Sequence, residues 1–323
     1  MTIKNRVVGV DISLEQTTYA IVDIRGNIIA RASFATTDIP NPTSYAAHLC
    51  DCIANMAEAN GGYDTIRSIG ISAPNGNYLT GCIENAHNLH WSGSIPLAAM
   101  MRDRLGLAVA LGNDAHVTAL GEHVFGSAHG MENFVCICLG TGIGSCIFSH
   151  NRAHLGADGF AGEFGHSCVI NGGRLCGCGQ RGCLEAYCAH KGIVQTATEL
   201  MEESTGESLM RHLDKLSPHT IADCCNQGDE MAIEVYRRTG MYLGIALANL
   251  ASVVDPEAII FTGGISKAGH WLIDPAYESF EEHVFHNIKG RIKLLCSTLE
   301  GSERDVLGAS ALAWGFKEYS LFK

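Results

Sequence analysis

The sequence predicts an α/β protein of two lobes built from a duplicated unit. Strands and helices alternate along 323 residues, a length that accommodates two domains of roughly 150 residues each. Two segments, 6–34 and 134–155, share one layout of an apolar strand, a polar or glycine-rich turn, a second strand and a tight turn. Two such openings, about one domain apart, indicate that the unit occurs twice.

Each lobe continues with helices and buried strands. Apolar residues at helical spacing predict a helix over 44–60, which the pair Gly61-Gly62 ends. The further predicted elements are a strand at 66–72, helices at 96–105 and 115–125, a strand at 107–111, a helix at 231–254, a strand at 258–261 and a helix at 305–316. No linker rich in Pro, Gly or Ser interrupts them. We place a smaller lobe at 1–118 with 305–323 and a larger lobe at 119–304.

Composition excludes several classes of protein. The chain has 22 Lys and Arg against 34 Asp and Glu, a net charge of −12, which argues against nucleic acid and anionic membranes as partners. Its longest uncharged apolar stretches, 134–148 and 244–254, fall short of the roughly 18 to 20 residues that span a bilayer. No signal peptide is visible, so we expect a cytoplasmic protein in which most of the 14 cysteines are buried thiols.

The most specific motif is a cluster of metal-ligand residues. Cys176, Cys178 and Cys183 lie in one glycine-rich segment, and His166 precedes the first of them by ten positions. Three thiolates and an imidazole form a tetrahedral Zn²⁺ set, and the glycines let the backbone wrap tightly. Three free thiols on a loop are the alternative. Four protein ligands close the coordination sphere, so the zinc is expected to be structural, leaving the second nitrogen of His166 to bond a ligand.

Two glycine turns follow predicted strands. One is 139–144, which contains Gly140, Thr141 and Gly142, and the other is 262–264, which contains Gly263 and Gly264. Glycine allows backbone N–H groups to approach a phosphate, although a plain hairpin turn is the alternative for either segment alone. The chain has neither a P-loop motif nor a dinucleotide-binding Gly-X-Gly-X-X-Gly at a helix start.

Four polar residues are candidates for substrate chemistry. Asn113 and Asp114 fall where a strand ends and a helix begins, so Asp114 either caps the helix or takes a proton from a substrate hydroxyl beside Asn113. Glu163 and Glu185 flank the cysteine cluster. They are either solvated surface residues or acceptors that suit a ligand with many hydroxyl groups.

Taken in order, these motifs resemble those of the ROK family of repressors and sugar kinases, within the actin-like ATPase superfamily. The matching segments are 69–74, 88–91, 112–115, 139–144, 161–166 and 176–185. They cover most of the chain, and the last two are the most specific. The resemblance implies the actin-like, ribonuclease H-like fold, with two lobes on duplicated mixed five-stranded sheets flanked by helices and a cleft between the lobes.

The resemblance also implies an activity, an ATP-dependent hexokinase that phosphorylates a hexose, with glucose as the expected sugar. Asp114 is then the general base. The implied sugar-binding residues are Asn75, Asn88, Asn113, Glu163, His166 and Glu185. The implied ATP-binding residues are Asp11, Gly140, Thr141, Gly142, Gly263 and Gly264. Mg²⁺ accompanies ATP, Zn²⁺ is structural, and a homodimer is expected.

The chain departs from the family pattern at two loops. The usual Asp-X-Gly-Gly-Thr of the first phosphate turn is replaced by residues 11–15, which read Asp-Ile-Ser-Leu-Glu. The change removes two glycines and adds a negative charge, with Ser13, Gln16 and Thr17 as possible replacement donors. Asn75 is inserted in the usual Pro-Gly of a loop at the sugar. Alternatives are therefore a kinase for N-acetylmannosamine, N-acetylglucosamine, fructose or allose, a sugar-binding protein without catalysis, and a DNA-binding regulator, which the acidic charge disfavours.

Overall fold

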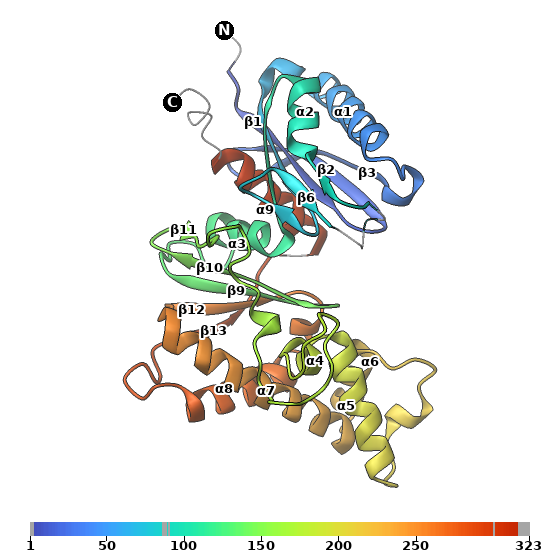
Figure 1. Ribbon diagram of the computed structural model, residues 1–323, viewed down its shortest axis with the longest axis vertical. Coiled ribbons are helices and arrows are strands. Elements are labelled where there is room, and N and C mark those ends of the chain that lie inside the picture. Colours follow the sequence, from blue (N-terminus) through green and yellow to red (C-terminus); the bar gives the residue numbers. More distant parts are fainter. Residues whose placement is uncertain (1–2, 86–88, 90, 300, 316–323) are drawn as a thin grey trace. The chain divides into compact units, whose positions relative to one another are not determined.

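The computed structural model describes residues 3–85, 89, 91–299 and 301–315. Its core is formed by two mixed five-stranded sheets with the same topology (Figure 1). The first has the order β3-β2-β1-β4-β8, and the second β11-β10-β9-β12-β13. In each, three antiparallel strands are followed by two parallel ones. The predicted duplication and fold class are confirmed.

The strands that the sequence predicts have bounds close to those expected, whereas β5, β6, β7 and β13 are additional. The first sheet contains β1 (Arg6–Ile12), β2 (Gln16–Asp23), β3 (Ile28–Ala35), β4 (Ile66–Ser72) and β8 (Ala108–Gly112). The second contains β9 (Phe134–Leu139), β10 (Ile143–Ser149), β11 (Arg152–Ala153), β12 (Ala258–Thr262) and β13 (Lys293–Cys296). A small third sheet joins β5 (Gly76–Asn77), β6 (Cys82–Glu84) and β7 (Ser94–Ile95). Because β10 begins at Ile143, the glycine turn before it is shorter than predicted.

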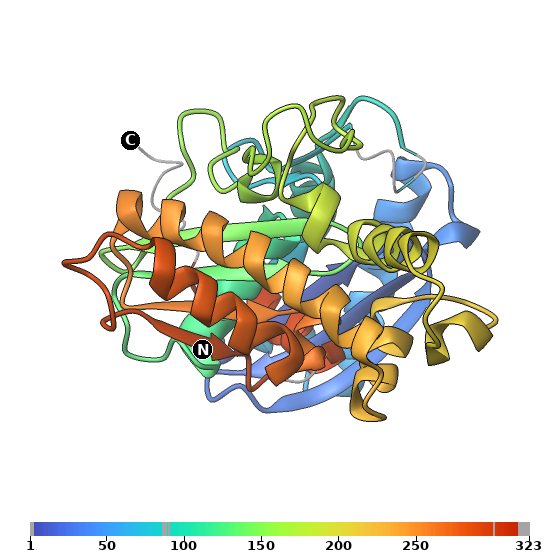
Figure 2. The same ribbon diagram turned by 90° about the horizontal axis from the view of Figure 1, so that it is seen from below.

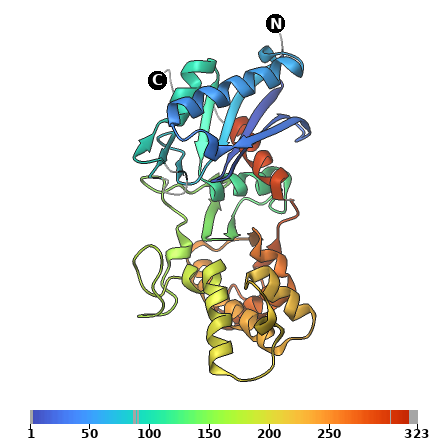
Figure 3. The same ribbon diagram turned by 90° about the vertical axis from the view of Figure 1, so that its right-hand side faces the viewer.

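Helices cover both faces of the first sheet. They are α1 (Pro42–Ala59), α2 (Leu97–Leu105), α3 (Asp114–Phe125) and α9 (Gly301–Gly315). The helices on the two faces of this sheet can be followed in Figure 3. Side chains alternate along β1, so Val8 and Val10 pack in the core with α1 and α2, whereas Val7 packs with α9. A Cβ at Gly9 would lie 2.2 Å from the carbonyl oxygen of Val306. Glycine is therefore what allows α9 to approach the sheet.

The second sheet is packed against a long helical pair. Its helices are α4 (Glu185–Cys188), α5 (His190–Glu203), α6 (Pro218–Asn226), α7 (Glu230–Val254) and α8 (His270–His283). Helices α7 and α8 lie side by side (Figure 2). Their contact is close, because a Cβ at Gly244 would lie 2.5 Å from the carbonyl oxygen of Ala276. The 3₁₀ helices are η1 (Thr36–Asp38), η2 (Tyr63–Thr65), η4 (Phe164–His166), η5 (Leu209–His212) and η6 (Ile265–Ala268).

Contacts divide the chain into two compact units. The first unit contains the described residues up to Gly130, Leu155–Phe160 and those from Thr298 onward, and the second contains Met131–His154 and Ala161–Ser297. These bounds differ from the expected 118 and 304 because all of α3 packs on α9, where a Cβ at Gly121 would lie 3.1 Å from the Cα of Gly308. Among the helices in the described residues, none combines the length and apolar composition needed to cross a membrane.

Candidate active site

Asp114 is the first residue of α3, at the end of β8. The residue that caps α3 is Asn113, whose Oδ1 accepts the N–H of His116 at 2.7 Å. Asp114 therefore does not have the capping role that was the alternative prediction for it. Asp114 Oδ1 accepts the N–H of Ala115 at 2.8 Å. Burial raises the pKa of Asp114, and the negative charge of Asp305 raises it further. A carboxylate with a raised pKa is a stronger base.

Asp11 lies at the end of β1, in register with Ser72 of the parallel strand β4. Burial raises its pKa to about 7, Asp305 and Asp114 add to this rise, and a hydrogen bond from Ser72 opposes it. Arg304 forms an ion pair with Asp305, with 2.7 Å between Nη2 and Oδ1. The first unit therefore gathers three carboxylates and one guanidinium, with Asp114 among them.

The first phosphate turn is closed by its own polar side chains. Ser13 Oγ donates to the carbonyl oxygen of Gln16 at 2.8 Å, and Gln16 Nε2 donates to Ser33 Oγ at 3.0 Å. The Thr17 hydroxyl is buried and bonds the hydroxyls of Thr36 and Tyr45. Internal hydrogen bonds therefore engage the side chains of all three predicted replacement donors, and their part in binding phosphate stays a prediction.

Asn75 has a structural part in the loop that carries it. Its φ is 54°, in the left-handed region that asparagine tolerates. Its Nδ2 donates to the carbonyl oxygens of Glu84 at 3.0 Å and Asn85 at 3.2 Å, which uses both of its protons. Only its Oδ1 is then left for a sugar hydroxyl. Asn88, the other predicted sugar-binding asparagine of this region, lies outside the described residues.

No sequence motif singles out Asn77, a buried residue of the same loop. Its Nδ2 donates to the carbonyl oxygen of Asp158 at 2.9 Å, and its Oδ1 accepts the N–H of Leu79 at 2.9 Å. Gly159 packs against it, since a Cβ there would lie 2.6 Å from Asn77 Oδ1. Asn77 thereby holds Leu155–Phe160 in the first unit. The contact joins residues far apart in sequence, so no local motif could reveal it.

In the second unit, the four predicted metal ligands converge. The ligand atoms of His166, Cys176, Cys178 and Cys183 all lie within 4.8 Å of one another. The Sγ atoms of Cys178 and Cys183 are 3.7 Å apart, and His166 Nδ1 lies 3.7 Å from Cys176 Sγ. The edges of a tetrahedron with Zn–S bonds near 2.3 Å measure about 3.8 Å. The donor set and its spacing both fit Zn²⁺.

The electrostatics of the cluster also suit a cation. Burial, followed by hydrogen bonds to the neighbouring thiols, raises the pKa of Cys183 to about 12. The N–H of Gln180 lowers the pKa of Cys178. A divalent cation favours thiolates, and would overcome the cost of burying them.

Glu163 lies beside the other nitrogen of His166. Its Oε2 is 4.0 Å from His166 Nε2, while Nδ1 faces Cys176. Both residues are partly open to solvent, and the 3₁₀ helix η4 holds His166 three positions after Glu163. This arrangement leaves a carboxylate and an imidazole on the open side of the metal cluster, where they can bond hydroxyl groups.

Glu185 joins the metal cluster to the second phosphate turn. Its Oε2 accepts the N–H of Ile143 at 2.9 Å, and Cys176 Sγ lies 3.8 Å from Oε1. A Cβ at Gly142 would lie 2.7 Å from Glu185 Oε2, so a larger residue there would displace the Glu185 carboxylate from its place. The turn itself is tight, since the N–H of Gly140 bonds the carbonyl oxygen of Gly142, and Thr141 is exposed at its tip.

The two predicted glycine turns are neighbours. Thr262 of β12 pairs with Cys138 of β9, so both turns leave the same end of the sheet. Gly263 has a φ of 92°, and a Cβ there would lie 2.3 Å from the carbonyl oxygen of Leu139. The second unit thus brings together the turns, the metal cluster, Glu163 and Glu185. The first unit holds Asp11, Asn75, Asn113 and Asp114.

Comparison with known proteins gives the family. The sequence model of the ROK family matches residues 7–315. The chain belongs to the ROK family. A glucokinase from Streptomyces coelicolor is 33% identical over 315 residues, covering 95% of this chain and 96% of that protein. The xylose repressor of Bacillus subtilis is 26% identical and matches 94% of this chain and 76% of its own length.

A solved structure of the ROK family agrees with this assignment. It is a ROK family glucokinase from Streptomyces griseus in complex with glucose and AMPPNP, 31% identical, with a TM-score of 0.73 over 96% of this chain and 99% of that one. The chain therefore has the actin-like ATPase fold of ROK sugar kinases. The family also contains repressors. Membership in it therefore supports recognition of a sugar but does not by itself assign one reaction.

Proposed function

We propose that this ROK protein is an ATP-dependent kinase of a hexose, with glucose as the expected substrate. The observation that carries the proposal is Asp114, a solvent-accessible carboxylate with a raised pKa at the start of α3 that Asn113 relieves of the capping role. Its position after a parallel strand suits a base aimed at a substrate. The glucokinase relative at 33% identity supports the same reaction.

Asp114 would act as general base. Its ionised carboxylate accepts the proton of a sugar hydroxyl while the hydroxyl oxygen attacks the γ-phosphorus of ATP, and the bond to ADP breaks. Backbone N–H groups of the turn at 140–142, with the Thr141 hydroxyl, would bind phosphate oxygens, and Gly263-Gly264 would border the nucleoside. Asp11 would contribute to binding the nucleotide, as the family resemblance implies. Mg²⁺ bound to ATP supplies neutralising charge.

Sugar recognition would depend on acceptors and donors around the metal cluster. Glu163, His166 and Glu185 would bond hydroxyls from the second unit, and Asn113 and the Oδ1 of Asn75 from the first. Asn88 keeps its place in this set as a prediction from the sequence. A cytoplasmic homodimer is likewise our proposal, by the same family resemblance.

The substrate can be named by analysis of the products. Purified protein with Mg·ATP is incubated separately with glucose, fructose, allose, N-acetylmannosamine and N-acetylglucosamine, and each mixture is analysed for a sugar phosphate by mass spectrometry. A sugar phosphate from glucose with the highest kcat/KM confirms the proposal. Preferred turnover of an N-acetylhexosamine would change the substrate, and no product from any sugar would contradict the kinase.

Zinc would organise the loop that carries Glu185 and His166. Metal analysis of the purified protein should find about one zinc per chain, as expected for a closed four-ligand site. Cys178→Ser should lose the metal and weaken sugar binding in calorimetry. Cys296→Ser is a matched control, since Cys296 is an exposed thiol on β13, outside the cluster. Unimpaired sugar affinity in protein without metal would contradict the role of the loop.

A second candidate is a sugar-binding regulator without phosphoryl transfer. The first phosphate turn favours it, because its donors bond one another and Glu15 is exposed there. The xylose repressor relative shows that the family includes regulators. Calorimetry separates the candidates: a regulator of this kind binds sugar but not AMPPNP, whereas a kinase binds both.

A further inference from the structure

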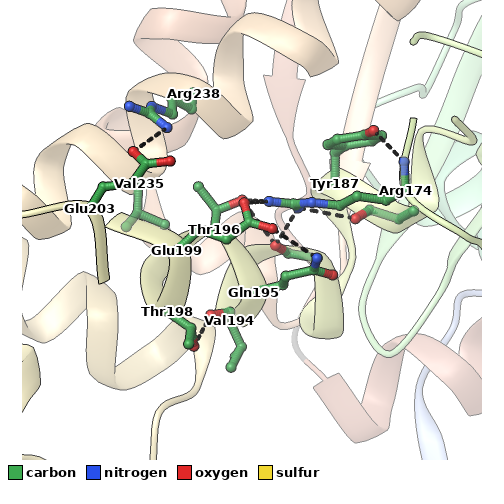
Figure 4. Close-up of polar contacts among 12 residues, drawn as sticks. Arg174, Tyr187, Val194, Gln195, Thr196, Thr198, Glu199, Glu203, Val235 and Arg238 are labelled. Atoms are coloured by element: carbon green, nitrogen blue, oxygen red, sulfur yellow. Dashed lines mark hydrogen bonds and ion pairs between the residues drawn. The ribbon is translucent and has the colours of Figure 1, made fainter. Parts of the chain in front are cut away.

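The metal loop, residues 167–184, carries the three cysteine ligands between His166 and α4. Arg174 lies two positions before Cys176, the first of these ligands, and its side chain extends to α4 and α5 (Figure 4). Only 14% of that side chain is exposed. Its Nη1 donates to the carbonyl oxygens of Ala186 at 3.3 Å and Gly192 at 3.0 Å. Its Nη2 donates to Thr196 Oγ1 at 3.1 Å and pairs with the carboxylate of Glu199. One guanidinium thus bonds four acceptors on or beside α4 and α5.

Tyr187 adds a second attachment on α4, the helix that begins at Glu185. The guanidinium of Arg174 lies over the Tyr187 ring, 4.8 Å from its centroid, and the backbone N–H of Arg174 donates to the Tyr187 hydroxyl at 2.8 Å. A Cβ at Gly173 would lie 2.1 Å from that hydroxyl. Both the side chain and the backbone of Arg174 therefore contact α4.

The loop has its own backbone hydrogen bonds but little regular secondary structure, so an attachment to the helices adds to its order. Between His166 and Glu185 the described backbone has no helix after η4 and no strand, only turns and isolated bridges, and five of its residues are glycine. The carbonyl oxygen of Arg174 accepts the N–H of Gly182 at 2.8 Å. Arg174 therefore connects the part of the loop before Cys176 to the segment that carries Cys183.

We propose that Arg174 is a positioning residue that fastens the metal loop to α4 and α5 and so sets the affinity of the loop for its metal. The inference rests on the proposed zinc site. None of the described side-chain contacts of Arg174 is with a metal-ligand atom, so it acts by limiting the geometries that the loop samples. The planar guanidinium group offers five N–H donors in a fixed geometry that suits this set of acceptors, and the ammonium group of lysine cannot reproduce it. Loss of outer contacts at metal sites typically costs about 10- to 100-fold in affinity.

The test compares zinc retention in Arg174→Lys with retention in a matched control. Arg211→Lys is the control, because Arg211 also donates to backbone carbonyl oxygens of the second unit, those of Met201, Ser204 and Gly206, outside the metal loop. Zinc affinity is measured by competition with a chromophoric chelator, and ligand geometry by the visible spectrum of the Co²⁺-substituted protein. We expect Arg174→Lys to weaken zinc binding by about 10- to 100-fold and to alter the Co²⁺ spectrum, with no change in the control.

Glu199→Gln provides a second variant should Arg174→Lys fail to fold. It removes only the anionic partner of the guanidinium, from a side chain that is 41% exposed. A smaller loss of zinc affinity in the same direction supports the inference. The inference is overturned if both variants keep the zinc affinity and the Co²⁺ spectrum of the wild type. If Arg174→Lys does not fold, the same result in Glu199→Gln alone overturns it. A wild-type protein that contains no zinc would also overturn it. Zinc affinity and the Co²⁺ spectrum are measured without kinase activity. Failure of the proposed function would appear separately, as the absence of turnover.

Discussion

The residue on which the account depends, Asp114, does not titrate alone. Asp305 lies close enough to raise its pKa, and Arg304 opposes this effect. Asp305 was not a predicted site residue, because it follows Asp114 by almost two hundred positions and only the packing of α9 brings it near. The charge state of the base is thus set in part by the last described helix.

Asp305→Asn should change the pH dependence of the reaction. A general base must be ionised, so activity falls as the pH decreases through the raised pKa of Asp114. Removing the negative charge of Asp305 lowers that pKa, and the acidic limb of log kcat/KM should move to lower pH. Asp103→Asn, on the exposed surface of α2, should leave the limb unmoved. A shift to higher pH with Asp305→Asn would contradict the assigned cause.

Asp11→Asn should stabilise the fold above neutral pH. The folded pKa of Asp11 is about 7 against an ordinary value of 3.8. Between these values the folded state holds a proton that the unfolded state has lost, so the contribution of Asp11 to stability falls as the pH rises. The neutral asparagine avoids this loss. Urea unfolding at pH 8 should show a gain of roughly 2 to 4 kcal/mol, which vanishes near pH 4.

Asp23→Asn is the control for the opposite sign. The side chain of Asn27 and backbone N–H groups lower the pKa of Asp23, so its charge stabilises the fold above the ordinary pKa. Its replacement should destabilise the protein at pH 8. Equal effects of the two substitutions would contradict the role of burial at Asp11.

At the scale of elements, the first phosphate turn separates this chain from the family pattern. Restoring that pattern with Ser13→Gly, Leu14→Gly and Glu15→Thr should lower the KM for ATP, because two peptide N–H groups gain access to phosphate and one negative charge is lost. A single exposed charge of this kind is worth about 1 kcal/mol, which corresponds to roughly fivefold in KM. The KM for the sugar should not change. An unchanged or higher KM for ATP would show that the turn does not contact the nucleotide.

The sequence predicted the elements that carry strong local signals. The helix α1 has apolar residues at helical spacing, and β4 is a buried apolar run, so both were expected within a few residues of their bounds. Helices α5, α6 and α8 and strand β13 were not predicted. In α8 a proline, Pro275, lies inside the helix and hides its pattern, and β13 is a partly exposed strand at the edge of its sheet.

The site was predictable where one segment carries it. The metal ligands lie within one loop and its preceding 3₁₀ helix, so their spacing alone indicated convergence. The interactions of Asn77, Arg174 and Asp305 depend on segments that meet only in the fold, and spacing carries no trace of them. The hydrogen bonds of Gln16 and Thr17 were also not predictable, because their partners belong to other strands and helices.

At the scale of the whole molecule, the duplicated sheets carry different chemistry. The turn after β1 and the turn after β9 occupy equivalent places in the two sheets. The turn after β1 bonds its own side chains next to the partly buried Asp11, whereas the turn after β9 has glycines beside Glu185. The first unit supplies the proposed base, and the second supplies the metal loop and the open glycine turns. Neither unit alone contains the residues that the proposed reaction needs.

The most direct test of this account is the rate of ADP release from Mg·ATP with glucose, compared between the wild type and Asp114→Asn, with Asp103→Asn as the surface control. Loss of a general base typically lowers the rate by about 10² to 10⁴. We expect sugar-dependent release in the wild type and in the control, a fall of that size in Asp114→Asn, and similar glucose binding in all three. Sugar-dependent ADP release at an undiminished rate in Asp114→Asn would contradict the central claim.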